Sequence, residues 1–107
     1  MRLSLGVAIL GAVLIGSAVT AAESPVASVE MRQETYVPDH LTVAPGTTVE
    51  WTNHDSMPHS VTADGKFDSG PIMPGKKFRW TVKEAGNVDY RCIFHPSMTA
   101  SLTVAKP

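Results

Sequence analysis

The chain has 107 residues, with 9 Lys and Arg against 10 Asp and Glu, so its formal net charge is −1. This near balance excludes the strongly basic surface of a nucleic-acid-binding protein and the acidic tail of a solvating segment. Hydrophobic residues make up 43% of the sequence and charged residues only 18%, which is typical of a folded chain and not of a disordered one. The length allows one small domain.

The first segment, residues 1–22, is predicted to be an export signal. Arg2 supplies a positive charge, an uncharged run follows it, and the run ends in the small residues Ala21 and Ala22. This pattern is typical of a cleaved signal peptide, so we expect a periplasmic protein whose mature domain spans residues 23–107. A retained membrane anchor is the alternative, because the run is about the shortest that spans a bilayer. Only in that case would the protein contact a membrane.

Cys92 is the single cysteine of the sequence, so no internal disulfide can form. A domain of this size buries only about 60–65% of its unfolded surface and lies near the margin of stability. Small exported domains usually compensate with disulfides or a metal. A lone thiol in an oxidising compartment is also open to oxidation unless something occupies it. Both arguments favour a bound metal.

The mature region is predicted to be all-β. No window shows sustained helical periodicity, whereas apolar and polar residues alternate with a period of two in several short segments. The segments expected to be strands, in chain order, lie at Ala27–Met31, Leu41–Val43, Val49–Trp51, Phe78–Val82, Val88–Cys92 and Ala100–Val104. Short strands at this spacing, separated by Gly and Pro, predict a Greek-key β-sandwich. The same alternation assigns Trp51 and Trp80 to the core.

Four side chains with metal-ligand character occur in two short segments. His59 follows the strand that contains Trp51, and Cys92, His95 and Met98 form a C-x-x-H-x-x-M array at the end of a later strand. Two imidazoles, one thiolate and one thioether make a trigonal His₂Cys set with a weak axial Met. The thioether is too soft a ligand for zinc, calcium or magnesium. We therefore expect one copper ion that alternates between Cu(II) and Cu(I).

His54 competes with His59 for the role of the first imidazole ligand, because it lies only five residues earlier between polar neighbours. We favour His59, since Pro58 fixes the backbone before it and the strand pattern resumes at Val61. His40 and His54 are interpreted as surface residues or as hydrogen-bonded core residues.

Further motifs extend over nearly all of the mature chain. They are Leu41-x-Val43-x-Pro45-Gly46, Thr48-Val49-x-Trp51-x-Asn53, Met57-Pro58-His59-x-Val61 and Tyr90-x-Cys92-x-x-His95-Pro96-x-Met98. In these motifs the sequence resembles the small blue copper proteins, the cupredoxins, and among them the amicyanins, which share the two-residue gap between the second His and the Met. The resemblance implies that His59, Cys92, His95 and Met98 bind one copper, which shuttles one electron. It implies an electron carrier and not an enzyme.

Two departures from the amicyanin pattern lie next to the expected ligands. Ser60 stands where amicyanins carry Asn, and Ile93-Phe94 stand where they carry Thr-Pro. The hydrogen bonds between the two ligand loops are therefore expected to differ. The resemblance also implies redox protein partners, with an amine dehydrogenase and a c-type cytochrome as candidates. We expect a monomer that binds no nucleic acid.

The resemblance also implies that electrons pass through the exposed edge of His95. The apolar side chains expected to surround that edge are Met57, Pro58, Ile93, Phe94 and Pro96. Phe94 is predicted to point outward and contact a redox partner, and the alternative is that it packs beneath the copper.

Three other functions remain open from the residues alone. Periplasmic copper delivery or buffering would use the same four ligands in a more open site, and it is favoured by the nearby His54 and Met57. A structural zinc site would use Cys92 and the histidines without the thioether. A cysteine hydrolase would use Cys92 as nucleophile and a histidine as base. The Met of the C-x-x-H-x-x-M array favours electron transfer over the zinc site and the hydrolase, and copper delivery stays the alternative.

Overall fold

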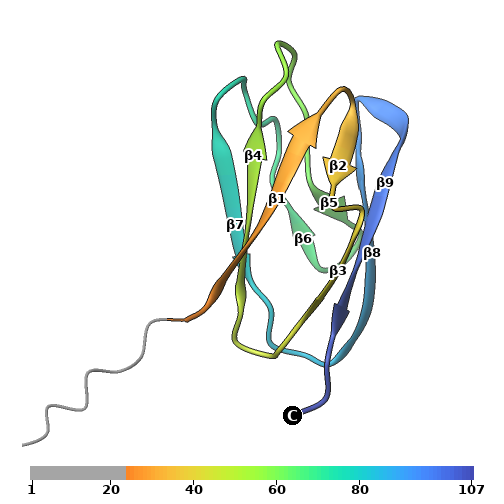
Figure 1. Ribbon diagram of the computed structural model, residues 1–107. Helices are drawn as coiled ribbons and strands as arrows, with labels where there is room; N and C mark the ends of the chain where they lie inside the picture. The colour runs from red at the N-terminus through yellow and green to blue at the C-terminus, as the bar shows by residue number, and fades with distance from the viewer. Residues whose placement is uncertain (1–23) are drawn as a thin grey trace, which may run out of the picture.

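The computed structural model describes residues 24–107, and the predicted export signal lies outside this range. A four-stranded sheet with the order β2-β1-β4-β7 faces a five-stranded sheet with the order β3-β9-β8-β5-β6 (Figure 1). The strands are β1 (Val26–Arg32), β2 (Thr35–Val37), β3 (His40–Val43), β4 (Thr48–Asn53), β5 (Thr62–Ala63), β6 (Phe67–Asp68), β7 (Lys77–Thr81), β8 (Gly86–Cys92) and β9 (His95–Val104). The prediction of an all-β sandwich is confirmed.

The connections cross repeatedly from one sheet to the other. β1 pairs in parallel with β4, and β3 pairs in parallel with β9, while the remaining strand pairs are antiparallel. The chain therefore leaves the first sheet after β2, enters the second sheet with β3 and returns with β4. None of the described segments forms a helix with the length and apolar character that a membrane span requires.

The core lies between the two sheets and follows from the alternation in the sequence. The β1 side chains Val29 and Met31 and the β4 side chains Val49 and Trp51 are buried from the first sheet. Tyr90 and Cys92 of β8 and Leu102 of β9 are buried from the second sheet. The Trp51 ring lies 5.5 Å from the Tyr90 ring between centroids, at a nearly perpendicular angle. Burying a large apolar side chain in this way contributes about 1.5–3 kcal/mol.

The prediction that Trp80 belongs to the core is wrong. Trp80 is 40% exposed, whereas Trp51 is fully buried. The physical reason is the position of β7, which is the edge strand of its sheet and pairs only with β4. Trp80 instead covers the side of the core, with its ring centroid 5.4 Å from that of Phe67.

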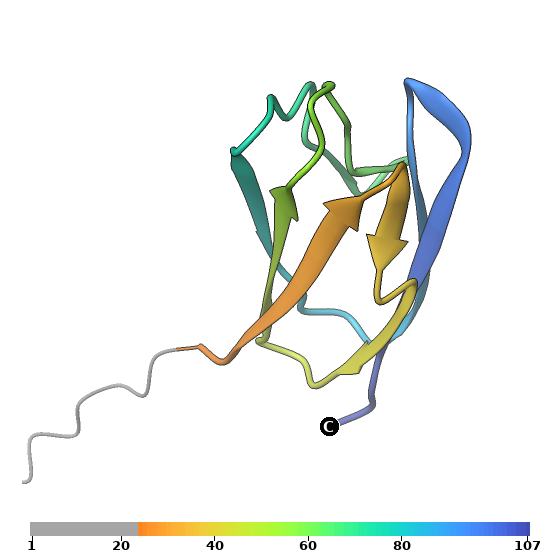
Figure 2. The ribbon, with the colours of Figure 1, turned by 45° about the horizontal axis from the view of Figure 1, so that its top comes forward.

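Four connections meet at the end of the sandwich opposite the C-terminus (Figures 1 and 2). They are the β1–β2 turn, the β4–β5 loop, the β6–β7 loop and the β8–β9 turn. Gln33 and Glu34 form the β1–β2 turn with φ of 51° and 59°, the left-handed pair that a two-residue hairpin turn needs. These four connections, together with the strand ends beside them, carry the candidate site described below; Met98 lies further along β9.

Candidate metal centre

Three of the four predicted ligands form one cluster. One ligand atom from each of His59, Cys92 and His95 lies within 4.8 Å of the other two. His59 comes from the β4–β5 loop, Cys92 ends β8 and His95 begins β9. His59 and Cys92 are buried, and His95 is partly exposed. Side chains that are more than thirty residues apart in the sequence are thus brought to one point.

The orientation of the two imidazoles fits a metal ion. Nδ1 of His59 lies 3.8 Å from the Cys92 Sγ, and Nδ1 of His95 lies 3.7 Å from it. With metal–nitrogen bonds of about 2.0 Å and metal–sulfur bonds of about 2.3 Å, a trigonal arrangement places N and S about 3.7 Å apart. In both imidazoles, Nδ1 therefore lies at the distance from the Cys92 Sγ that a shared metal ion requires.

The β4–β5 loop is held in place by its backbone and by one buried amide. His59 and Ile72 exchange two backbone hydrogen bonds, with the His59 N–H donating at 3.1 Å and the Ile72 N–H at 2.7 Å. The buried Asn53 side chain donates through Nδ2 to the carbonyls of Met57 and Ile72, at 2.8 and 2.9 Å. Its Oδ1 accepts the Asp55 N–H. Asn53 thus joins the loop that carries His59 to the neighbouring β6–β7 loop.

Asp55 fixes the orientation of the His59 ring. Asp55 Oδ2 accepts a hydrogen bond from His59 Nε2 at 2.7 Å, which leaves Nδ1 facing the sulfur as the lone-pair nitrogen. The backbone N–H groups of Gln33 and Glu34 donate to the same carboxylate at 2.7 and 2.9 Å. Burial raises the pKa of Asp55, but the hydrogen bonds from Glu34, His59 and Gln33 outweigh it and hold that pKa below its ordinary value.

Ser60 links the two ligand loops. Its backbone N–H points to the Cys92 Sγ at 3.3 Å, and its Oγ accepts the Ile93 N–H at 2.9 Å. The Tyr36 hydroxyl donates to the Ser60 carbonyl at 2.5 Å. A hydrogen bond to sulfur stabilises the thiolate over the thiol, so this contact favours the form of Cys92 that binds metal.

The remaining predicted residues divide between this end of the molecule and other surfaces. Met98 is buried in β9, in the same hairpin as Cys92 and His95. His54 lies outside the cluster, exposed, with Nε2 3.5 Å from a Glu30 carboxylate oxygen. The cluster thus contains His59 and not His54.

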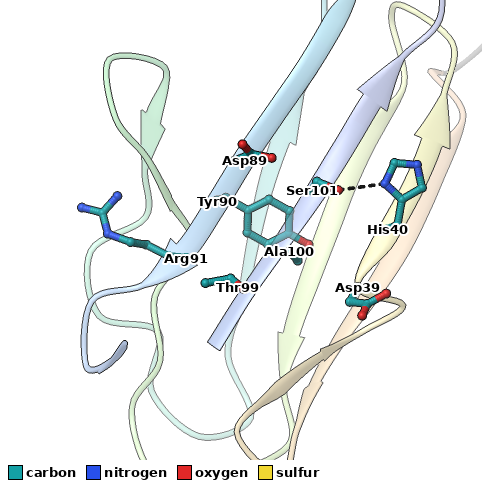
Figure 3. A pocket seen from close by; sticks show the side chains of 8 residues that line it. All are labelled: Asp39, His40, Asp89, Tyr90, Arg91, Thr99, Ala100 and Ser101. Atoms are coloured by element: carbon teal, nitrogen blue, oxygen red, sulfur yellow. Dashed lines mark hydrogen bonds between the residues drawn. The ribbon is translucent and has the colours of Figure 1, made fainter. Parts of the chain in front are cut away.

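His40 lies on the outer face of the five-stranded sheet. It lines a shallow hollow of about 620 Å³ and contacts Ser101, with 2.8 Å between Nδ1 and Oγ (Figure 3). The lining residues are Asp39, His40, Asp89, Tyr90, Arg91, Thr99, Ala100 and Ser101, none of which belongs to the ligand cluster. His40 is thus a hydrogen-bonded surface residue, as the sequence predicted.

Exposed apolar side chains and one carboxylate lie at the end of the sandwich that carries His95. Ile93 and Phe94 form the β8–β9 turn and are exposed, Phe94 to 45%, so the outward position predicted for Phe94 is confirmed. Met73 of the β6–β7 loop is also exposed. Glu34 places a carboxylate oxygen 3.8 Å from His95 Nε2.

Sequence reasoning missed the roles of Asp55 and Glu34. For Asp55 a signal exists, because a carboxylate four residues before a candidate ligand histidine can reach its ring. For Glu34 no local signal exists, since it is 61 residues from His95 in the chain. Only the pairing of β1 with β2 and β4 brings the β1–β2 turn to this end.

The fold and the cluster agree with what comparison with known proteins finds. The chain belongs to the cupredoxin-like family, since the model of the cupredoxin-like domain matches residues 5–104. Among characterised proteins it is similar to amicyanin of Paracoccus denitrificans, with 32% identity over 106 residues that cover 85% of this chain and 81% of the relative. Amicyanin of Paracoccus versutus is 31% identical over 75 residues, which cover 64% of this chain and 57% of that protein.

Solved structures give the same result. A mutant of amicyanin in the Cu(I) form superposes with a TM-score of 0.72 at 26% identity, covering 79% of this chain and 95% of that one. A purple cupredoxin from Nitrosopumilus maritimus superposes with a TM-score of 0.71 at 31% identity, covering 74% of this chain and 99% of that one.

The family and the donor set together define the cofactor as one copper ion. The amicyanin-like cupredoxins are electron carriers and not enzymes, and the similarity of this chain to them implies a blue copper electron carrier. The sequence prediction of a copper protein of the amicyanin type is thereby confirmed.

Proposed function

We propose that this protein is a type 1 copper protein that carries single electrons between redox proteins in the periplasm. In this proposal His59, Cys92 and His95 hold the copper, and the Met98 thioether is the weak fourth ligand. The observation that carries the proposal is the approach of two Nδ1 atoms to one buried sulfur, at 3.8 and 3.7 Å. Bound there, copper would supply a Cu(II)/Cu(I) couple.

The chain contributes rigidity around that couple. The Asp55 carboxylate orients the His59 ring, and the Ser60 backbone N–H contacts the Cys92 sulfur. The Asn53 amide holds the β4–β5 loop that carries His59. Each of these side chains is itself fixed by further hydrogen bonds or by burial. A ligand set that is held in place before and after electron transfer has little to rearrange, so the barrier to transfer stays low.

Electron exchange is assigned to the exposed side of His95. His59 is buried behind Asp55, whereas the His95 side chain is 21% exposed beside the apolar residues Ile93 and Phe94. A small apolar surface suits brief contacts, since weak redox encounters use small interfaces. A dehydrogenase as donor and a c-type cytochrome as acceptor are the partner classes that we propose.

Copper delivery is the less favoured function. It would need an exchangeable site with accessory soft ligands, and His54, one of the two residues that favoured it, lies outside the cluster and faces Glu30. We also propose that residues 1–22 direct export and are then removed. Mass spectrometry of the protein from a periplasmic fraction tests this, and a full-length chain in the membrane fraction would contradict it.

The test of the electron-carrier proposal is a spectrum of the Cu(II)-loaded protein. We expect an intense visible band from charge transfer between the Cys92 thiolate and copper, and a narrow parallel hyperfine splitting in EPR. Cys92→Ser should abolish both, while His54→Ala, the matched control, should leave both intact. A colourless wild-type protein that binds Cu(I) and releases it readily to a chelator would contradict the proposal and favour copper delivery.

A further inference from the structure

Glu34 occupies a fixed position at the edge through which electrons are proposed to pass. Its carboxylate oxygen Oε1 lies 3.8 Å from His95 Nε2, the imidazole nitrogen that faces away from the sulfur, and its side chain is 51% exposed. The backbone that carries it is held by the hydrogen bonds from Gln33 and Glu34 to Asp55. The charge is therefore presented by a rigid turn.

Neighbouring carboxylates at this end are already compensated. Glu30 forms an ion pair with Arg32 at 2.7 Å, and Asp55 accepts hydrogen bonds from His59 and from two backbone N–H groups. Among residues 24–107, Glu34 has no Lys or Arg within ion-pair distance, and its only such contact is the His95 ring. Among the described residues next to the ligand cluster, Glu34 thus carries a negative charge that no Lys or Arg neutralises.

Exposed apolar side chains share this end of the sandwich with Glu34. Ile93, Phe94 and Met73 are all exposed at the same end of the sandwich. A partner that covers His95 closely enough for electron transfer must also cover Glu34 and remove water from its carboxylate. That desolvation is costly unless the partner places a cation or hydrogen-bond donors against it.

We propose that Glu34 is a specificity-determining residue that selects redox partners with a lysine or arginine at their own electron-transfer edge. A partner with an acidic residue at that position is disfavoured by like-charge repulsion. This inference rests on the proposed electron-carrier function, and it specifies the chemistry of the partner surface at the same site.

The test compares oxidation of the copper-loaded, reduced protein by two small oxidants of opposite charge, tris(phenanthroline)cobalt(III) as the cation and hexacyanoferrate(III) as the anion. The measured quantity is the ratio of the two rate constants, cation over anion, because a change in driving force on substitution affects both oxidants alike. Glu34→Gln should lower this ratio roughly tenfold at an ionic strength of about 10 mM, and Glu34→Lys should lower it further. At high salt the ratios of the wild-type protein and of both variants should converge, because salt screens the charge.

Glu84→Gln is the matched control. It removes the same charge from the connection between β7 and β8, at the opposite end of the sandwich (Figure 1). At an ionic strength of about 10 mM the Debye length is roughly 30 Å, so a charge at the far end of the sandwich acts only weakly on the oxidants. The Glu84→Gln ratio should therefore stay within about twofold of the wild-type ratio. If Glu34→Gln changes the ratio no more than Glu84→Gln does, the inference is overturned. If the wild-type protein exchanges electrons with neither oxidant, the proposed function itself fails, which is a different result.

A second readout needs no copper. Hexaamminechromium(III), an inert paramagnetic cation, should broaden the amide signals of residues 33–35 and 93–97 in the metal-free wild-type protein. In Glu34→Gln this broadening should be lost, while broadening near other carboxylates persists. Equal broadening at these residues in both proteins would contradict the inference, whatever the kinetics show.

Discussion

The two ends of the sandwich hold their loops by different means. At the end opposite the ligand cluster, backbone groups bond to one another, as in the Gly46 N–H to the Val82 carbonyl at 2.7 Å and the Val82 N–H to the Thr47 carbonyl at 2.9 Å. At the cluster end, side chains add to backbone pairs such as His59 with Ile72, because Asn53, Asp55 and Ser60 bond to backbone through their side chains. Backbone bonds depend little on residue type, so the opposite end should tolerate substitution while the cluster end should not.

Copper loading should give the largest effect, because it acts on the cluster end alone. An ion that binds the folded state and not the unfolded state stabilises it by about 4 kcal/mol at a thousandfold excess over Kd. Thermal unfolding of the metal-free and copper-loaded proteins measures this difference. Equal melting temperatures at saturating copper would show that the ligands do not come from distant segments.

Asn53→Ala should be the most damaging single change at the cluster end. The substitution leaves two carbonyls and one N–H without their buried partner, which costs about 3 kcal/mol. Denaturant unfolding of the metal-free protein measures the loss. Lys83→Ala, an exposed change at the opposite end, should cost less than about 0.5 kcal/mol. Similar losses for both variants would remove the contrast between the ends.

Ser60→Ala should have a smaller effect on stability and a separate effect on the metal. It removes the acceptor of the Ile93 N–H and should cost about 1 kcal/mol, while the backbone N–H to the sulfur remains. With one of the two contacts between the loops removed, we expect a shifted reduction potential and a broader EPR spectrum. An unchanged potential in protein-film voltammetry would mean that the loops are held without this contact.

Glu50 tests the middle of the molecule, away from both ends, and should give the smallest effect. Hydrogen bonds from Lys77 and Arg79, at 3.1 and 2.6 Å, hold the pKa of Glu50 below its ordinary value. Since the folded pKa is lowered, this contribution to stability is complete above about pH 4.5 and is lost as the pH falls through the lowered value.

Glu50→Gln should therefore reduce stability by about 0.5–1 kcal/mol at pH 7 and by nothing at low pH. The colour of the copper-loaded protein should not change. A difference that persists below the folded pKa would mean that packing, and not charge, is the cause.

Six of the strands and the ligand hairpin of Cys92 and His95 were predictable because both depend on short-range patterns. Alternation identified β1, β3, β4, β7, β8 and β9, and the spacing of Cys92 and His95 identified the ligand hairpin. The strands β2, β5 and β6 are only two or three residues long, which is too short to show an alternation of apolar and polar residues. The longer strands β1 and β8 supply the hydrogen-bonding edge for β2 and β5, and β6 in turn pairs with β5.

Tertiary position explains the remaining differences. Trp80 has the strand spacing of a core residue, but nothing in the local pattern reveals that its strand lies at a sheet edge. The hydrogen-bonded surroundings of the ligands likewise arise between segments distant in the chain, as in Gln33 with Asp55 and Ser60 with Ile93. The candidate metal-ligand atoms are therefore easier to identify from the sequence than the hydrogen-bonding groups that orient them.

The β1–β2 turn imposes a compromise on the residues that occupy it. Gln33 and Glu34 both adopt left-handed backbone conformations, in which a residue with a long side chain is less stable than glycine by about 1 kcal/mol. Replacing Glu34 with Gly or Asn should therefore stabilise the hairpin. The same replacement deletes the carboxylate beside His95. An engineer who optimised this protein for heat resistance alone would erase the feature that we infer distinguishes its partners, and a screen for thermal stability would report that loss as an improvement.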